Sequence, residues 1–410
     1  MATNGIVIVG GGLAGATAAE ELRERGFEGP IHLYAAEPHN PYIRPPLSKE
    51  YFTGKDARDS VFVHPERWYT DAGIVVTTGE RVTALGDHRV TLASGREVPF
   101  DRLLLATGAT PRRLDVPGAD APGIHRLRTI EDSETLRDEL AAGGRQVVVV
   151  GSGWIGLEIA AAARGYGNTV TVVSPARIPL AGPLGDELGT MFRELHEQNG
   201  VTFRLETNVL GFEQRDGRVS GVETDGGTIP ADVVVIGIGA APDTALAEAA
   251  GLTIAEPQNG GGILVDQHLA TSAQDVFAAG DVANAFHSVI GQHMRNEHWA
   301  TAIASGKVAG ASLAGADASL DDIPYFYTDQ YDLGMEYSGY PPLTRGAEVV
   351  YRGDRSGREF IAFWMRGDRV VAGMNVNVWD VNEDVQRLIR AGGPVDRARL
   401  VDESVALTEV

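Results

Sequence analysis

The chain has 410 residues, of which 43% are hydrophobic, 51 are glycine and none is cysteine, and its formal net charge is −21. Without cysteine there can be no disulfide, thiolate metal site, chain-borne iron–sulfur cluster or redox-active cysteine pair. The negative charge argues against binding to nucleic acid or anionic membranes, and no apolar stretch reaches the roughly 18–20 residues that span a bilayer. The first strand pattern begins almost at the N-terminus and leaves no room for a signal peptide, so we expect a cytoplasmic protein of two or three domains.

A glycine-rich loop follows the apolar run 6–9 and precedes an alanine-rich helical pattern over 14–25. Its spacing, G-x-G-x-x-G, is typical of strand–turn–helix units that bind dinucleotides. The first glycine permits the tight turn, the second lets a pyrophosphate approach the backbone, and the third lets the helix pack closely. The helix N-terminus directs free N–H groups at the phosphate. We therefore predict a nucleotide site formed by Gly10, Gly12, Leu13, Ala14 and Gly15.

An acidic residue that binds the ribose hydroxyls is expected about 20 residues beyond such a loop. The next strand pattern, 31–35, leads to Glu37. Glu37 is therefore the predicted ribose ligand of the first site.

A second loop of the same spacing follows the apolar run 147–150 and precedes a helical pattern over 157–165. A glycine-rich turn without a ligand is the alternative for either loop, but two loops in the same strand–turn–helix setting favour two nucleotide sites. One chain would then hold two nucleotides and pass electrons between them. The predicted second site contains Gly151, Gly153, Trp154, Ile155 and Gly156.

The acid position of the second unit holds Ser174, and Arg177 follows three residues later. Serine does not repel a 2′-phosphate, and arginine could pair with one, so the second site could accept NADPH as well as NADH. An ordinary surface arginine is an equally good interpretation of Arg177.

Three apolar strand patterns end in small-residue turns, and together they predict the domain organisation. The first ends in Ala106, Thr107 and Gly108, and the second in a turn that includes Gly239. The third ends in Asp281, which could bind ribityl or phosphate oxygens or could be a simple turn residue. This recurrence predicts two related α/β domains, one inserted into the other. The predicted divisions are 1–112 with 242–322, then 113–241, and finally 323–410.

The character of the chain changes at about residue 323, where tyrosines cluster and short alternating apolar runs follow. The runs 360–364 and 370–373 predict a meander of strands, and a helical pattern covers 382–390. We expect a small α+β domain here, with no recognisable pattern in the last residues.

The order of these parts resembles the FAD-dependent ferredoxin and rubredoxin reductases of bacterial oxygenase systems, the putidaredoxin reductase-like family, and is also similar to apoptosis-inducing factor. The segment 41–49, with the sequence PYIRPPLSK, is the most distinctive match. The resemblance covers nearly the whole chain. It implies a glutathione-reductase-like layout: two Rossmann-like dinucleotide-binding domains, FAD in the first and NADH or NADPH in the second, and a C-terminal domain over the flavin.

The resemblance also implies roles for individual residues. Arg44 and Pro45 would lie along FAD, with Arg44 near the pyrophosphate. Lys49 would lie near flavin N5, where a cation stabilises negative charge on the reduced ring. Glu158 matches the position that pairs with this lysine, although a helix first-turn acid is the plainer alternative, and Trp154 would face the nicotinamide. Lys49, Glu158 and Trp154 are thus the predicted catalytic residues.

Further matches place the segment containing Glu297, His298 and Trp299 by the pyrimidine end of the flavin. Tyr327 matches a tryptophan that packs near the ring system, with a core aromatic as the alternative. The chain departs from the family at three positions. Ala36 stands where relatives often place the ribose acid, Ser174 replaces the usual acid of the second site, and Thr301 replaces an asparagine.

The function implied is an NAD(P)H-dependent flavoprotein reductase that passes single electrons to a small ferredoxin or rubredoxin serving an oxygenase such as a cytochrome P450. The alternatives are an NAD(P)H oxidase or quinone reductase, and a redox-sensing protein like apoptosis-inducing factor. We expect a monomer or weak homodimer without a metal site. Arg352, Arg355 and Arg358 could form a basic docking patch for an acidic ferredoxin, although a solvated strand edge of mixed charge is slightly favoured.

Overall fold

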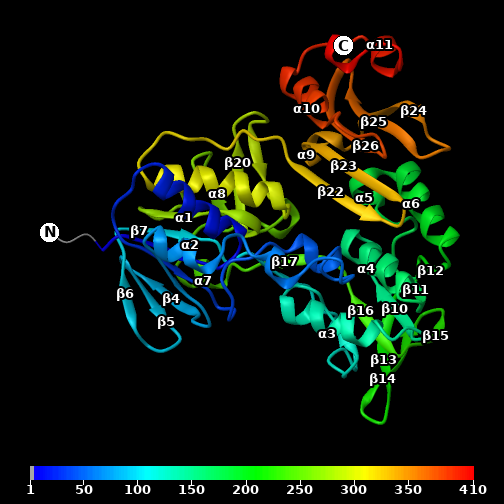
Figure 1. Ribbon diagram of the computed structural model, residues 1–410, viewed down its shortest axis with the longest axis horizontal. Coiled ribbons are helices and arrows are strands. Elements are labelled where there is room, and N and C mark those ends of the chain that lie inside the picture. Colours follow the sequence, from blue (N-terminus) through cyan, green and yellow to red (C-terminus); the bar gives the residue numbers. More distant parts are fainter. Residues whose placement is uncertain (1–3) are drawn as a thin grey trace.

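The computed structural model describes residues 4–410 and divides them among three lobes (Figure 1). Two lobes contain a parallel five-stranded sheet each, and the third contains an antiparallel one. The predicted fold class, two dinucleotide-binding α/β units and a smaller α+β unit, is confirmed. No helix within residues 4–410 is both long enough and apolar enough to cross a membrane.

The first parallel sheet has the strand order β19-β7-β1-β2-β3. Its central strand β1 is buried along its whole length, as expected for a parallel strand covered on both faces. The bounds of the five strands are β1 Ile6–Val9, β2 Ile31–Tyr34, β3 Ile74–Thr77, β7 Arg102–Leu105 and β19 Val276–Ala278.

Helix α1 (Leu13–Glu24) begins directly after the first glycine loop and packs against α8 (Trp299–Leu313). Small residues allow this close approach. A side chain at Gly306 would come within 2.7 Å of the Ala14 carbonyl oxygen, and one at Gly310 within 2.7 Å of the Ala18 carbonyl oxygen. The contact brings α8, far along the chain, beside the helix that follows the first loop.

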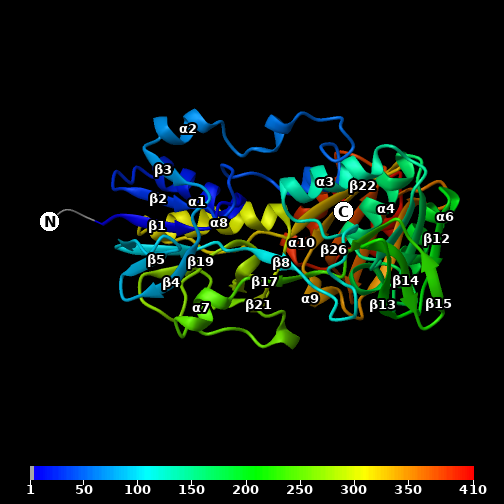
Figure 2. The same cartoon turned by 90° about the horizontal axis from the view of Figure 1, so that it is seen from below.

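Shorter elements complete this lobe. In Figure 2, α2 (Glu66–Asp71) and α7 (Ala245–Ala249) lie on opposite sides of the layer that contains β1 and α8. Two small three-stranded sheets, which we did not predict, are built from β4 (Val82–Gly86), β5 (Arg89–Leu92) and β6 (Glu97–Pro99), and from β18 (Ile263–Val265), β20 (Ala283–His287) and β21 (Gln292–Met294).

The second parallel sheet has the order β12-β11-β10-β16-β9. Its strands are β9 Ile124–His125, β10 Gln146–Val150, β11 Thr169–Val173, β12 Val201–Arg204 and β16 Val233–Ile236. The helices are α3 (Ile130–Leu140), which a Thr129–Asp132 capping box starts, α4 (Trp154–Gly165), α5 (Ala181–Leu184) and α6 (Asp186–Gln198). An antiparallel sheet adds β13 (Val209–Arg215), β14 (Arg218–Thr224) and β15 (Gly227–Pro230).

The chain leaves the first lobe and returns to it along two paired segments. β8 (Ala109–Pro111) leads out and β17 (Ala240–Pro242) leads back, and the two form an antiparallel pair. Both crossings between the lobes therefore lie side by side.

The third lobe is an antiparallel sheet of order β22-β23-β26-β25-β24. Its strands are β22 Tyr325–Gln330, β23 Leu333–Gly339, β24 Glu348–Asp354, β25 Glu359–Arg366 and β26 Arg369–Val376. Helix α10 (Asn382–Ala391) packs on β23 and β26, while α9 (Pro341–Thr344) and α11 (Arg397–Val401) are short. The last residues, for which we predicted no element, thus contain α11.

A continuous hydrophobic cluster joins the second and third lobes. Leucines and Phe192 of α4–α6 pack in one buried group with side chains of β23, β25 and β26; the group includes Leu157, Leu188, Phe192, Leu195, Met335, Tyr337, Phe360 and Trp364. This packing holds the sheet of the third lobe against the helix that follows the second glycine loop.

Candidate active site

The two glycine loops have the same geometry. Gly10 and Gly151 have positive φ angles of +126° and +108°, and a side chain at either would collide with the carbonyl oxygen of the residue that follows a neighbouring strand, at 2.0 Å and 2.3 Å. A side chain at Gly15 or Gly156 would lie 2.4 Å from the carbonyl oxygen of its own loop's first glycine. The backbone geometry thus requires glycine at the first and third positions of both loops.

The second glycines, Gly12 and Gly153, differ from the others because nothing lies within 4 Å of the place a side chain would take. Each is the residue before a helix, and no side chain caps either helix start. Uncapped N–H groups beside open space form an anion site at the positive end of a helix dipole. Both loops therefore fit the pyrophosphate of a dinucleotide.

Lys49 and Glu158, two of the predicted catalytic residues, form a buried ion pair between the first and second lobes. Lys49 follows a short 3₁₀ turn, Pro45–Ser48, and Glu158 lies in the first turns of α4. The distance from Lys49 Nζ to Glu158 Oε1 is 2.6 Å, and the expected pairing is therefore present. Ser48 Oγ donates to the other carboxylate oxygen at 2.5 Å.

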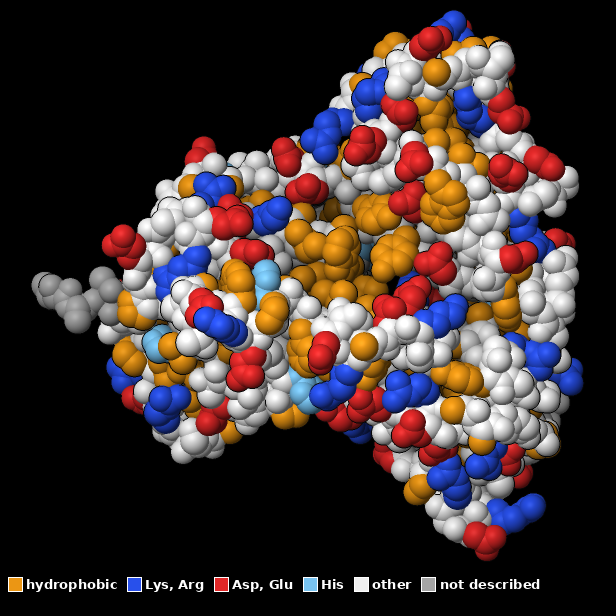
Figure 3. Space-filling view, in the orientation of Figure 1, with side chains coloured by type: hydrophobic (Ala, Val, Ile, Leu, Met, Phe, Trp, Pro, Cys, Tyr) orange, Lys and Arg blue, Asp and Glu red, His pale blue; other side chains and the backbone are white. Residues whose placement is uncertain are grey.

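Partly exposed aromatic side chains surround this pair. Lys49 Nζ lies 5.5 Å from the ring centre of Tyr327 on β22. The ring centre of Phe326 lies 5.0 Å from that of Trp154 at the start of α4 and 4.5 Å from that of His298. Figure 3 shows hydrophobic side chains gathered in the hollow between α8, α4 and β22. This hollow can accept a planar ring system next to the ion pair.

His298 and its neighbours lie where the first loop and the third lobe meet. His298 is the residue before α8, and burial lowers its pKa to about 4, so the ring is neutral. Its Nδ1 is buried and has no partner within residues 4–410. Trp299 is 39% exposed, and Glu297 pairs with Arg295 at 2.7 Å. The unpaired nitrogen fits a bound polar group such as the edge of a flavin.

Glu37 and Arg44, predicted to bind the ribose and the pyrophosphate, contact each other. Arg44 Nη2 lies 2.7 Å from Glu37 Oε1, and Arg44 Nη1 donates to the hydroxyl of Tyr42 at 3.0 Å and to the carbonyl of Arg128. Tyr42 also donates to Glu37. The two predicted ligands thus form one partly buried cluster and not two separate contacts.

Asp281 has a partner that the sequence analysis missed. Arg128 donates through Nη2 to Asp281 Oδ2 at 2.9 Å, and the same nitrogen would lie 3.1 Å from a side chain at Gly108. Arg128 therefore brings a cation to the turn that contains Ala106, Thr107 and Gly108. The Thr129–Asp132 capping box, which directly follows Arg128, is the sequence signal that could have drawn attention to it.

Ser174 and Arg177, on which the prediction that the second site could accept NADPH depends, both have partners within the chain. The Ser174 hydroxyl is buried and lies 2.9 Å from the hydroxyl of Ser152 inside the second glycine loop. Arg177 is exposed but forms an ion pair with Asp186 at the start of α6. A 2′-phosphate would have to compete with Asp186 for the guanidinium.

The other predicted nucleotide contacts lie on the rims of the two loops. Ile155 is exposed, and Gly239 has a positive φ of +91° with open space around it. Thr107 donates to the carbonyl of Asp243 at 2.8 Å. Leu13, Ala14 and Pro45 occupy the starts of α1 and of the 3₁₀ turn.

The arginines of the hypothetical basic patch, Arg352, Arg355 and Arg358, all have partners within the chain. Arg352 donates to the carbonyl oxygens of Leu400, Asp402, Glu403 and Val405 and so fastens the C-terminal segment. Arg355 pairs with Glu187, and Arg358 bonds Gln198, both on α6. These arginines serve contacts within the chain, which favours the alternative of a mixed-charge strand edge.

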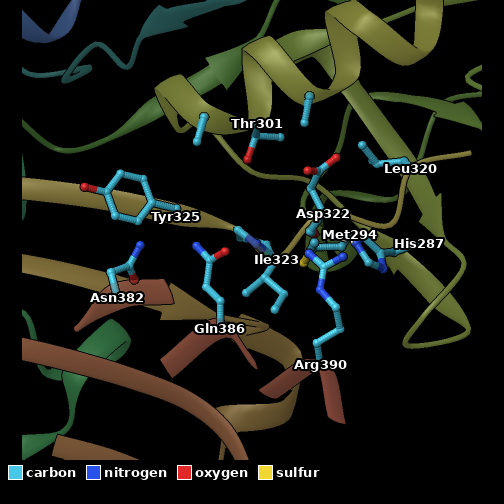
Figure 4. A pocket seen from close by; sticks show the side chains of 13 residues that line it. His287, Met294, Thr301, Leu320, Asp322, Ile323, Tyr325, Asn382, Gln386 and Arg390 are labelled. Carbon is cyan, nitrogen blue, oxygen red and sulfur yellow. Dashed lines mark hydrogen bonds between the residues drawn. The ribbon is translucent and has the colours of Figure 1, made fainter. Parts of the chain in front are cut away.

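A cavity of about 240 Å³ lies beside the site, between α8, the segment 320–325 and α10 (Figure 4). Thr301, Tyr325, Asn382, Gln386 and Arg390 line part of it. None of the predicted site residues lines it. Within residues 4–410 no group of three or more His, Asp or Glu side chains is arranged to hold a metal ion.

Two protein-family models match this chain, and the boundary between them lies near the start of the third lobe. A family model described as pyridine nucleotide-disulphide oxidoreductase matches residues 4–306, and one described as reductase C-terminal matches residues 325–410. The ferredoxin–NAD(+) reductase component of the anthranilate 1,2-dioxygenase system of Burkholderia cepacia is 38% identical over 410 residues, which cover 99% of each chain.

Two solved structures are similar over nearly the full length. Putidaredoxin reductase in its covalent complex with putidaredoxin has a TM-score of 0.94 at 34% identity, covering 100% of this chain and 98% of that one. The ferredoxin reductase for the CYP199A2 system of Rhodopseudomonas palustris has a TM-score of 0.93 at 33% identity, covering 99% of each chain.

Proposed function

Because the chain belongs to the pyridine nucleotide-disulphide oxidoreductase family and is an NAD(P)H-dependent flavoprotein oxidoreductase of the ferredoxin reductase type, we propose that it passes electrons from NAD(P)H to a small iron–sulfur ferredoxin that serves an oxygenase. The observation that carries this proposal is the Lys49–Glu158 ion pair. It joins the lobe of the first glycine loop to the helix of the second, so that the two proposed nucleotide sites would open on one hollow.

The family implies FAD and a nicotinamide nucleotide, and we propose FAD at the first loop and NADH or NADPH at the second. When bound, FAD would take two electrons as a hydride and release them one at a time. The loop around Gly12 and the side chain of Arg128 would hold the phosphates, and Lys49 would place a cation beside the ring. Trp154 would bound the nicotinamide position from α4.

We also propose domain limits that follow the lobes. Residues 1–112 and 242–322 would form the FAD domain, 113–241 the NAD(P)H domain and 323–410 the C-terminal domain. The adjacent segments β8 and β17 support an insertion at this point. The absence of cysteine agrees with electron release through the flavin, because no dithiol is available to carry electrons.

The test uses the protein purified with its flavin. Reduction by NADH and by NADPH is followed by stopped-flow absorbance without oxygen, and the reduced protein is then mixed with a [2Fe–2S] ferredoxin, a rubredoxin, a quinone or oxygen. We expect rapid reduction of the iron–sulfur acceptor and slow reaction with oxygen. Preferential reduction of oxygen or quinone would replace the proposal with an oxidase or quinone reductase. Slow reoxidation by every acceptor, with a change of oligomer size, would replace it with a redox sensor.

A further inference from the structure

A continuous line of hydrogen bonds connects the partly exposed Tyr331 to the buried carboxylate of Glu158. The Tyr331 hydroxyl lies 3.3 Å from Nδ1 of His196, and His196 Nε2 lies 2.7 Å from Oε1 of Gln330. Gln330 Nε2 lies 3.2 Å from Oγ1 of Thr328, which lies 2.7 Å from Oε1 of Glu158. The line runs from the β22–β23 turn into α6, back to β22, and ends in α4.

The carboxylate sets the direction of the bonds between Glu158 and His196, because an ionised carboxylate can only accept hydrogen bonds. The Thr328 hydroxyl must donate to Glu158, so its oxygen accepts from the amide nitrogen of Gln330. The amide oxygen then faces His196, whose Nε2 must carry the proton. In a neutral ring this is the Nε2–H tautomer, whose Nδ1 then accepts from the Tyr331 hydroxyl.

The inner members of the line are shielded from water. His196 is 0% exposed, and Gln330 and Thr328 are each 1% exposed. Burial lowers the pKa of His196 to about 4, which agrees with a neutral ring. Hydrogen bonds in such surroundings are strong when all are satisfied, and an unpaired member is costly.

Thr328 and Lys49 approach the same oxygen of Glu158, at 2.7 Å and 2.6 Å, while Ser48 donates to the other oxygen at 2.5 Å. Loss of the Thr328 hydroxyl would remove one of the three donors that fix the carboxylate, so that the group could turn toward the donors that remain. The lysine would then follow the carboxylate, because Glu158 is its only ion-pair partner within residues 4–410.

We propose that Thr328, Gln330 and His196 are positioning residues that hold Glu158, and through it Lys49, in the orientation required at the flavin site. The inference rests on the function proposed above. Since His196 belongs to α6 and Thr328 to β22, the network makes the geometry of the ion pair depend on how the third lobe packs against the second.

The first test compares Thr328→Val, which keeps the shape but removes the hydroxyl, with Thr328→Ser, which keeps the hydroxyl. Thr224→Val is the matched control, because Thr224 is also buried but donates to a backbone carbonyl on β15. Flavin reduction by NADH should slow on the order of tenfold in Thr328→Val and in His196→Phe, with FAD content unchanged. Thr328→Ser should restore most of the rate.

The second test has a readout other than activity. In the FAD-bound protein with ¹⁵N-labelled histidine, NMR at pH 7 should show His196 as the Nε2–H tautomer. The signal should persist in Thr328→Ser and Thr224→Val and shift in Thr328→Val, where the direction of the bonds is no longer imposed. An Nδ1–H tautomer or a cation in the unsubstituted protein would overturn the network.

The outcomes separate this inference from the proposed function. If NADH and NADPH both fail to reduce the flavin of the unsubstituted protein, the proposed function is wrong, and the tautomer still tests the network. If flavin reduction is rapid but Thr328→Val behaves like Thr224→Val, or Thr328→Ser is as slow as Thr328→Val, the network has no positioning role.

Discussion

Lys49 Nζ lies 2.6 Å from Glu158 Oε1, although 109 positions separate the two residues along the chain. Both side chains are almost fully buried, with exposures of 6% and 3%. A buried ion pair contributes most visibly when one member is removed, because the remaining charge is left without its partner in a medium of low polarity.

We expect Lys49→Met to lower the free energy of unfolding by about 3 kcal/mol and to slow flavin reduction without emptying the FAD site. The double variant Lys49→Met/Glu158→Gln should lose less stability than the sum of the single losses, because neither charge is then left alone. Urea denaturation measures the free energy of unfolding of Lys49→Met, Glu158→Gln and the double variant. Removing one member of the exposed Arg67–Asp71 pair by Arg67→Met is the control, with an expected change of at most about 1 kcal/mol. Additive losses in the cycle would contradict a coupled pair.

The first glycine loop allows folding to be separated from nucleotide binding. Gly10→Ala places a side chain 2.0 Å from a carbonyl oxygen at a φ of +126°, so the protein should lose stability severely, on the order of 3 kcal/mol or more. Gly12→Ala meets nothing within 4 Å, so the fold should persist while the FAD content falls. Thermal unfolding and flavin absorbance after purification measure the two effects. Equal loss of stability in both variants would refute this assignment of roles.

The preference for the nicotinamide nucleotide should respond to the partner of Arg177. Asp186→Ala releases the guanidinium, so kcat/KM for NADPH relative to NADH should rise severalfold, about three- to tenfold. Arg177→Ala in the same background should cancel the gain. Glu197→Ala, which breaks the Arg193 pair on the same helix, serves as the control and should leave the ratio alone. An unchanged ratio in Asp186→Ala would place the 2′-phosphate elsewhere.

The pH dependence of the free energy of unfolding should reveal the protonation of His196. Its pKa is lowered from 6.5 to about 4 in the folded chain, so the unfolded chain binds more protons between these values. Stability therefore rises with pH through this window, and it is lost as the pH falls from 6.5 to 4, by up to about 3 kcal/mol. Denaturation between pH 4.5 and 7 should show a shallower slope for His196→Phe than for the unsubstituted protein. His298, whose pKa is also about 4, is present in both chains, so the difference isolates His196. Parallel curves would show that His196 does not titrate in this way.

Arg352 should contribute to the stability of the fold and not to the docking of a ferredoxin. Arg352→Ala removes donors from four carbonyl oxygens of the C-terminal segment, so we expect a loss of about 1–3 kcal/mol. Charge reversal of Arg355 and Arg358, which contact α6, should leave ferredoxin reduction within about twofold at low salt. A steep drop in that rate, with unchanged reduction of a small dye, would restore the basic patch as a docking surface.

Much of the fold could be predicted from local patterns. The glycine loops, the apolar strand runs and the helix over 382–390 are visible in short windows, and the structure contains them as β1, β10 and α10. Strands such as β6 and β15 in the small antiparallel sheets escaped prediction because they are short and largely exposed, so their hydrophobic period is weak. Arg128 escaped because the capping box beside it predicts only the start of a helix and not the contact between Arg128 and Asp281.

The sequence by itself determined the two glycine loops, since each depends on the backbone conformation of six neighbouring residues and on glycine at the three positions of the G-x-G-x-x-G spacing. Only the tertiary structure decided which charged and polar groups meet. It set Arg177 against Asp186, Arg44 against Glu37, and His196 and Thr328 on a line that ends at Glu158. The physical reason is range: a turn is specified by adjacent φ and ψ angles, whereas these hydrogen bonds and ion pairs act over a few ångströms between elements that only the packing of the lobes brings together.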